Sequence, residues 1–208
     1  MRPRQARAHA LPAAFYLRET AEVARDLLGC RLVRVLPGGE VRSAIIVETE
    51  AYLGIEDPAA HTWKGRRTPR VAPMWGPGGH AYVYFVYGIH HCMNVVTREG
   101  GAPQAVLLRA AVPEIWWRGG EATRDELRSL SGPGKLCKAL EITRALSGVP
   151  LTGPELVIEA GPSRTFSRLE GPRVGVDYAG EAATWPLRFA VAGCPAVSHA
   201  GKLTLRPE

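Results

Sequence analysis

The amino-acid sequence predicts a single α+β domain, built on a curved, mostly antiparallel β-sheet that a few helices flank and from which a β-hairpin protrudes. The chain has 208 residues, enough for one well-buried domain, and it contains no repeat and no convincing domain boundary. Strand-like segments outnumber helical ones and do not alternate regularly with helices, as a parallel sheet would require. We therefore expect one domain over residues 13–208, preceded by a disordered basic arm, residues 1–12.

Helices are predicted in three places. Residues 20–29 carry their apolar side chains on one face and end at a glycine. A short helix is expected within the polar segment 118–131. The clearest helix is 131–148, which Ser131 can cap and Gly148 can end. The other patterned segments are typical of strands: 30–36, 41–53, the two arms of a hairpin within 81–94, 105–112, 155–159, 173–178, 187–192 and 202–206.

The chain is basic, with a formal net charge of +6 and a sequence pI near 9.4, and nearly all of its cations are arginines. Arginine makes planar, bidentate contacts with phosphate, so the charge favours a nucleic acid as partner. An arginine-rich genome would give the same composition, so the charge alone leaves both explanations open.

Cysteine usage and the N-terminus indicate a cytoplasmic protein. The cysteines lie far apart without a CxxC pair, which indicates reduced thiols packed as small core residues: Cys30, Cys92, Cys137 and Cys194. No stretch is apolar enough to span a bilayer, and the basic N-terminus lacks the apolar segment of a signal peptide. We expect an intracellular protein that is not secreted and does not contact membranes.

Two carboxylates stand on one face of the predicted strand 41–53. Side chains alternate across a strand, so one face carries Ile46, Glu48, Glu50 and Tyr52, close to the point where a long loop begins. A carboxylate beside an aromatic ring is suited to act as a general base. An ordinary exposed strand face is the alternative.

Residues 56–80 form a Pro-, Gly- and Arg-rich segment without periodicity, which is longer than an ordinary connection and is expected to be functional or disordered. Its cationic run, from Lys64 to Arg70, suits a clamp for phosphates, and a solvated loop is the alternative. His61 precedes the run, and a lone loop histidine is usually neither ligand nor catalyst.

The predicted hairpin concentrates aromatic residues. Tyr82 and Tyr84 face one side of its first arm, whereas Phe85 and Tyr87 face the other. We expect Tyr82 and Phe85 to pack in the core. Tyr87 and Ile89 are expected near the tip, where exposed aromatic and aliphatic side chains can wedge between bases.

Two registers are open for this hairpin. A two-residue Gly-Ile loop pairs Tyr84 with Met93, whereas a three-residue Gly-Ile-His loop pairs Tyr84 with Asn94. Only the second register puts Tyr84 and Asn94 on one face of the sheet, as a shared pocket requires.

Metal and phosphate-loop motifs are weak. His90 and His91 are adjacent, so on a strand they point to opposite faces and do not easily share one ion, and no HExxH motif is present. We expect no metal and no cofactor, and a metal-dependent hydrolase using His61, His90 and His91 is the third-ranked function. The GPGK segment, 132–135, lacks the spacing of a phosphate loop, so it either caps a helix or binds a DNA phosphate through free amides.

Five motifs in order carry a family resemblance: VETEAYLG-x-E-D-x-A-A-H, R-x-T-P-R, YVY-x-x-YG-x-x-x-C-M-N, LLRA and SGPGKLC-x-AL. The segments GPRVGVDYAGE and PLRF near the C-terminus are similar too. From residue 14 to residue 206 the chain resembles the alkyladenine (3-methyladenine) DNA glycosylases. The resemblance implies an enzyme that flips an alkylated or deaminated purine out of duplex DNA and hydrolyses its N-glycosidic bond, leaving an abasic site for base excision repair.

The resemblance also implies roles for the residues of the site. Glu50 matches the general base that activates water, and Arg109 matches the arginine that helps to hold this water. Tyr52, His61 and Tyr84 match the residues that sandwich the flipped base, with the His61 main chain at the edge of the base. Electron-rich rings on both sides favour a cationic methylated purine by about 0.5–2 kcal/mol.

Further matches concern selectivity and DNA. Asn94 matches the residue that disfavours normal guanine by crowding its amine, and Tyr87 matches the wedge that fills the gap in the base stack. Arg66, Thr68 and Arg70 match positions that line the DNA backbone.

The chain departs from the family beside the wedge. Ile89 stands where methionine can occur, and His90 and His91 replace aromatic residues of some relatives.

None of the lysines is expected in the pocket, which favours hydrolysis without lyase chemistry. The implied partner is double-stranded DNA containing damaged purines, bound by a monomer that in a bacterium is associated with the nucleoid. The runner-up function is a non-catalytic module that binds damaged bases, which has no need for a carboxylate facing the pocket.

Overall fold

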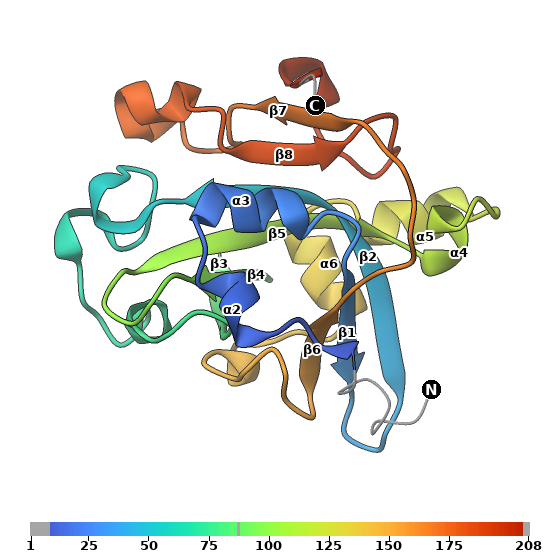
Figure 1. Cartoon of the computed structure of the whole chain (residues 1–208), viewed down its shortest axis with the longest axis horizontal. Helices are drawn as coiled ribbons and strands as arrows, with labels where there is room; N and C mark the ends of the chain where they lie inside the picture. Colours follow the sequence, from blue (N-terminus) through green and yellow to red (C-terminus); the bar gives the residue numbers. More distant parts are fainter. Residues whose placement is uncertain (1–8, 87, 206–208) are drawn as a thin grey trace.

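The computed structural model describes residues 9–86 and 88–205. Within these residues one nine-stranded sheet runs in the order β3-β4-β5-β2-β8-β7-β9, and β1 pairs with β2 and β6 beside this path (Figure 1). Every strand pair in the described part of the chain is antiparallel. The predicted single α+β domain on a mostly antiparallel sheet is therefore confirmed.

Most predicted strands are present, with ends that differ by one or two residues. The strands are β1 Arg31–Val35, β2 Val41–Tyr52, β3 Ala81–Val86, β4 His90–Thr97, β5 Gln104–Val112, β6 Leu156–Glu159, β7 Arg168–Gly171, β8 Arg188–Val191 and β9 Thr204–Leu205. The α-helices are α2 Ala13–Tyr16, α3 Thr20–Asp26, α4 Glu114–Trp117, α5 Arg124–Ser129 and α6 Pro133–Ala139. The short 3-10 helices are η2 Gly54–Glu56, η3 Trp63–Gly65, η4 Ala72–Trp75, η5 Arg144–Leu146, η6 Asp177–Thr184 and η7 Ala200–Lys202.

The longest strand, β2, runs between β5 and β8, and the helices α3 and α6 cover the central strands. α3 packs on β2 and β5, and α6 packs on β4 and β5. The apolar face expected of the first helix is buried, with Val23, Ala24, Leu27 and Leu28 in the main core. β7 and β8 lie at one end of the molecule, above β2 and α3 in Figure 1.

The predicted helix 131–148 is wrong beyond residue 139. α6 ends at Ala139, and Glu141 adopts a positive φ of 50°. Leu136 and Ile142 are both buried, although their spacing puts them on different faces of one continuous helix. Burial of both residues therefore requires the chain to turn. Ser131 does not cap the helix but bridges β5 and donates to the carbonyl of Ala196.

The predicted strand 173–178 is also wrong, because the strand in this region is β7. The Arg173 guanidinium makes a buried bidentate contact with Asp57, and the Val174 amide donates to a side-chain carboxylate of β2. The local pattern is strand-like, but its polar groups are satisfied by distant side chains instead of a strand partner. The short helix expected within 118–131 is α5, which begins with a capping box between Thr123 and Glu126.

The N-terminal arm differs in part from the prediction. Residues 1–8 lie outside the described residues. Ala10 pairs with Glu159, and the Leu11 amide donates to the carbonyl of Ile158 at 2.9 Å, so the chain already joins the edge of β6 at these positions.

The hairpin adopts neither of the two predicted registers. Tyr84 pairs with Cys92 and Val86 pairs with His90, which is the pair nearest to the tip of the hairpin. Tyr82 then pairs with Asn94, and because side chains alternate along a strand, Tyr84 and Asn94 still share one face.

Tyr82 and Phe85 were both expected in the core, but only Tyr82 is buried. Tyr82 is buried as predicted, with 1% of its surface exposed. Phe85 is 41% exposed and packs against His91, with 4.8 Å between the ring centroids, so the core prediction is wrong for Phe85. Ala81 and Val83 on the same face are buried in the main core, whereas Phe85 lies near the end of β3, beyond the part of this face that the core covers.

The four cysteines are free and buried, which confirms the prediction of reduced core thiols. Among the described residues, no helix has the length and apolar character that crossing a membrane requires.

Candidate active site

A row of cross-strand pairs brings side chains from five strands to one face of the sheet. Tyr82 of β3 pairs with Asn94 of β4, which also pairs with Leu107 of β5. Leu107 in turn pairs with Glu50 of β2, and Glu50 pairs with Arg188 of β8. Paired residues point to the same side of a sheet, so distant parts of the chain meet in this row.

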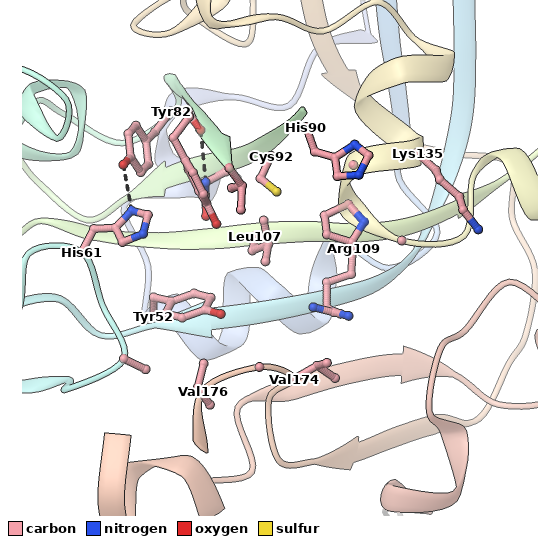
Figure 2. Close-up of a pocket in the computed structure, with 18 of the residues that line it drawn as sticks. Tyr52, His61, Tyr82, His90, Cys92, Leu107, Arg109, Lys135, Val174 and Val176 are labelled. Carbon is pink, nitrogen blue, oxygen red and sulfur yellow. Dashed lines mark hydrogen bonds between the residues drawn. The ribbon is translucent and has the colours of Figure 1, made fainter. Parts of the chain in front are cut away.

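This face carries a cavity of about 430 Å³ (Figure 2). Its walls come from alternating positions of β3, β4 and β5, from the first residues of α6 and from the loops after β2 and β7. The lining residues are Tyr52, Ala59, His61, Met74, Tyr82, Tyr84, Val86, His90, Cys92, Asn94, Leu107, Arg109, Ser131, Gly132, Pro133, Gly134, Lys135, Val174, Gly175, Val176 and Tyr178.

An irregularity between β2 and β5 brings one arginine between two carboxylates. The register shifts on both sides of Glu48, and Arg109 is the extra residue of β5 at the second shift. Bulges of this kind re-aim side chains. The Arg109 Nε atom donates to Glu48 Oε1 at 2.8 Å, and its Nη1 atom lies 3.2 Å from Glu50 Oε1. The predicted shared face of Glu48 and Glu50 is therefore confirmed.

The Glu50 carboxylate is fully buried and has three polar partners. Its Oε1 atom accepts from the Val174 amide at 2.7 Å and forms an ion pair with Arg109 at 3.2 Å, and its Oε2 atom accepts from the Tyr52 hydroxyl at 2.9 Å. All three partners line the cavity. Figure 2 shows the Tyr52 hydroxyl and the Arg109 guanidinium pointing toward the same region, next to Val174. Glu50 therefore lies directly behind the cavity wall.

Aromatic rings form the opposite end of the cavity. His61 packs edge-on against Tyr84, with 4.6 Å between the ring centroids, and its Nδ1 atom lies 2.8 Å from the Tyr82 hydroxyl. Tyr52, His61 and Tyr84 all line the cavity, so the structure brings together the three residues expected around a base.

These aromatic side chains are uncharged at neutral pH. Burial, together with the nearby guanidiniums of Arg70 and Arg66, lowers the pKa of His61 to about 4. Burial raises the pKa of Tyr82 to about 12 and raises the pKa of Tyr52 and of Tyr84 well above the ordinary range of a phenol. The cavity thus presents neutral rings on one side and a buried ion cluster on the other.

Asn94 is buried at the floor of the cavity beside Tyr82. Its Nδ2 atom donates to the Tyr82 carbonyl at 3.1 Å, which holds the side-chain amide in one orientation. Asn94 and Tyr84 both line the cavity, as the predicted shared pocket requires.

The described residues among those predicted to contact DNA lie on the surface, and Arg70 reaches the cavity rim. Arg66, Thr68 and Arg70 are exposed on the loop between η3 and η4. The Arg70 guanidinium lies 5.2 Å from the centre of the Tyr84 ring, at the edge of the cavity. Ile89 is 69% exposed in the hairpin connection. Tyr87 lies outside the described residues.

Lys135 corrects one expectation, because this lysine lines the cavity although no lysine was expected there. The GPGK motif was the available signal, but it does not tell which way α6 faces. Lys135 extends on the far side of Arg109 from Tyr52 and His61 (Figure 2). Because Lys135 lines the cavity, the expectation of hydrolysis without lyase chemistry finds no support in a pocket without lysine.

Other contributors to the site were not identified from the sequence. The segment Val174 to Val176 forms a wall, and Tyr178, 72% exposed, stands at the mouth. His90 also lines the cavity and packs on Gly134, where an added Cβ would lie 3.0 Å from the His90 ring. Within the described residues no three His, Cys, Asp or Glu side chains gather in an arrangement suited to a metal ion.

Comparisons with known proteins show the family of this chain. A family model described as methylpurine-DNA glycosylase matches residues 14–195. Three relatives bear the name "Putative 3-methyladenine DNA glycosylase". The relative from Desulfitobacterium hafniense is 48% identical over 189 residues, covering 84% of this chain and 91% of the relative. The relative from Clostridium acetobutylicum is 45% identical over 195 residues, covering 88% of this chain and 95% of the relative. The relative from Methanocella arvoryzae is 50% identical over 193 residues, covering 90% of this chain and 95% of the relative. The chain therefore belongs to the methylpurine-DNA glycosylase family of DNA-repair enzymes.

Proposed function

We propose that this protein is a monofunctional DNA glycosylase that draws an alkylated or deaminated purine nucleotide out of duplex DNA and hydrolyses its N-glycosidic bond with water activated by Glu50. The observation that carries this proposal is the buried Glu50 carboxylate, held by two hydrogen bonds and an ion pair from residues that all line an aromatic cavity. A protein that only binds damaged bases has no need for such a group.

The hydrogen bonds of Glu50 are consistent with a general base. A carboxylate accepts about four hydrogen bonds, and Glu50 accepts two from the protein, while its Oε1 atom also forms an ion pair with Arg109. Acceptor capacity is therefore left for a water molecule. In the proposed reaction this water bonds to the sugar carbon C1′ and gives its proton to Glu50. The C1′–N bond breaks, and its electron pair leaves with the base.

The aromatic end of the cavity supports recognition of a damaged purine. A methylated purine such as 3-methyladenine carries a positive charge, which the faces of neutral aromatic rings attract. Such a base leaves as a neutral molecule, so an oriented water is the main requirement. The fixed amide of Asn94 is proposed to crowd the exocyclic amine of normal guanine, and Tyr52, His61 and Tyr84 are proposed to enclose the base.

Extrusion of the nucleotide requires contacts to the rest of the duplex. Taking a base out of the stack costs a few kcal/mol, and the cost is smaller for damaged pairs. Exposed cations on the loop with Arg66, Thr68 and Arg70 are proposed to hold the backbone, and Tyr87 with Ile89 is proposed to fill the gap. We propose that a monomer suffices, because every residue of the cavity comes from one chain.

The test is base release from duplexes containing hypoxanthine or 7-methylguanine, with EDTA present, followed by chromatography of the free base. Wild-type protein is expected to release base, and Glu50→Gln is expected to lose about 100-fold or more of the rate, because it removes a general base. Binding of Glu50→Gln to a duplex with an abasic analogue is expected to persist. A matched control is Glu159→Gln, which removes another buried carboxylate, paired with Arg31 at 2.8 Å on the β1–β6 edge of the sheet.

Three outcomes would contradict parts of the proposal. Binding without base release by the wild type would favour the non-catalytic binding module. Full activity of Glu50→Gln would remove its role as base. Borohydride added during turnover traps a lysine Schiff base, and a trapped complex that is lost in Lys135→Ala would show lyase chemistry instead of simple hydrolysis.

A further inference from the structure

A second fully buried carboxylate, Glu48, lies beside Glu50 and does not line the cavity. Its Oε1 atom accepts from Arg109 Nε at 2.8 Å and from Arg188 Nε at 2.8 Å. Its Oε2 atom accepts from the Ser198 amide at 3.1 Å. Resting on the proposed function, we infer that Glu48 is a positioning residue that holds Arg109 in the orientation in which it faces Glu50 and the water.

Because the guanidinium of Arg109 is planar, a contact at its Nε atom also sets the direction of its Nη1 atom. The nitrogens of arginine form a rigid fork, so fixing one N–H direction fixes the plane and the directions of the others. Glu48 binds Nε of Arg109, and Ser198 Oγ lies 3.3 Å from Nη2. With these two nitrogens held, Nη1 of Arg109 is directed to Glu50, 3.2 Å away.

The charges of this cluster balance. Two carboxylates, Glu48 and Glu50, lie with two guanidiniums, Arg109 and Arg188, and all four side chains are nearly or fully buried. Removing the charge of Glu48 leaves one excess positive charge in a buried site. Arg109 then has a single carboxylate partner, and the water must share Glu50 with a guanidinium that no longer has a fixed direction.

A segment near the C-terminus completes the cluster. Ser198 follows β8, and both its amide and its hydroxyl lie within hydrogen-bonding distance of Glu48. Its carbonyl accepts from Nη2 of Arg188, which also lies 2.8 Å from Glu48. Ser198 therefore contacts Glu48 and both arginines of the cluster, although it lies 150 residues from Glu48 in the sequence.

The decisive measurement is a single-turnover rate at saturating protein, compared with the Kd for a duplex containing an abasic analogue. Glu48→Gln keeps an oxygen for Arg109 Nε but removes the charge. Its rate is expected to fall about 10-fold to 100-fold, because a neutral amide oxygen holds the guanidinium less firmly than a carboxylate does, whereas the Kd is expected to be unchanged. Ser198→Ala removes only the hydroxyl contacts and is expected to lower the rate by a smaller factor with the same Kd.

The control separates positioning from simple loss of stability. Glu159→Gln also removes a fully buried carboxylate from an arginine and is expected to lower stability without changing the single-turnover rate of the folded protein. An unchanged rate for Glu48→Gln, or a fall in rate matched by an equal rise in Kd, overturns the inference. If Glu48→Gln does not fold, Ser198→Ala decides, and an unchanged rate for Ser198→Ala then overturns it. Loss of activity in the wild type itself would instead refute the proposed glycosylase reaction.

Discussion

At the scale of single residues, His61 shows how position sets the charge of the cavity wall. The ring is partly buried, lies 2.8 Å from the Tyr82 hydroxyl through Nδ1, and stands near the guanidiniums of Arg66 and Arg70. These surroundings lower its pKa to about 4, so the ring is neutral at physiological pH. A protonated ring would repel the cationic base that the cavity is proposed to hold.

His61 is expected to make the protein less stable in acid. The unfolded chain has a histidine pKa near 6.5 and the folded chain one of about 4, so between these values the unfolded state binds more protons. The free energy of unfolding therefore falls as the pH drops through this window, by at most about 1.4 kcal/mol per pH unit. Urea unfolding of wild type and His61→Gln at several pH values checks this. The advantage of wild type over the variant should shrink toward acid pH, and a constant difference would contradict the assignment.

Single residues also show the limit of local patterns. Alternation along β2 correctly predicted that Glu48, Glu50 and Tyr52 share a face, because this periodicity is a local property of a strand. It could not predict that Phe85 is exposed or that Lys135 reaches the cavity. The exposure of Phe85 depends on how far along β3 the rest of the chain covers the strand. The position of Lys135 depends on which side of α6 faces the cavity.

At the scale of elements, the loop between β2 and β3 pairs cations with aromatic rings. Lys64 lies 5.6 Å from the Trp63 ring centre, and the Arg67 guanidinium lies 3.5 Å from that of Trp75. The Trp75 Nε1 atom also donates to the Arg66 carbonyl at 3.3 Å. Trp75 therefore orders an exposed cationic segment that would otherwise be flexible, next to the rim of the cavity.

Arg67→Ala is expected to weaken binding to all duplexes equally, because a phosphate contact reads no sequence. The slope of log affinity against log salt should fall by about one for the loss of one such contact. Fluorescence anisotropy at several salt concentrations measures this slope. Arg168→Ala is the matched control, since Arg168 is an exposed arginine on β7. Equal slopes for wild type and Arg67→Ala would show that Arg67 does not contact the backbone.

Elements also differ in how far the sequence predicts them. Strands β1, β2 and β5 and helix α3 follow from apolar periodicity and turn residues. The register of the β3–β4 hairpin does not, because loops of similar length allow several pairings and the choice depends on which side chains are buried. The bulge that turns Arg109 toward both carboxylates has no local sequence signal.

At the scale of the whole molecule, a buried ion pair joins two loops that both line the cavity and are far apart in the sequence. Asp57, after β2, and Arg173, after β7, are both fully buried and make a bidentate contact. Asp57 also accepts from the amides of Leu53 and Ala59, and Arg173 donates to the carbonyl of Ala182. This pair holds Tyr52 and Val174, the donors to Glu50, at a constant separation.

Asp57→Asn is expected to destabilise the protein by about 3–5 kcal/mol, because it leaves the Arg173 charge buried without a partner. Urea unfolding measures the loss. Asp26→Asn provides the comparison, since Asp26 pairs with Arg18 at 2.8 Å on the surface, and an exposed pair contributes at most about 1 kcal/mol. Equal effects of the two substitutions would show that the Asp57–Arg173 contact does not stabilise the folded protein.

The amino-acid sequence by itself determined the fold class, the principal strands, the shared face of the β2 carboxylates and, through its ordered motifs, the family. These follow from local periodicity and residue type. Only the tertiary structure decided the hairpin register, the position of Arg109 between Glu48 and Glu50, and the approach of Val174 and Ser198 to those carboxylates. The physical reason is that buried charges must find partners, and these partners lie on segments that are far apart in the chain.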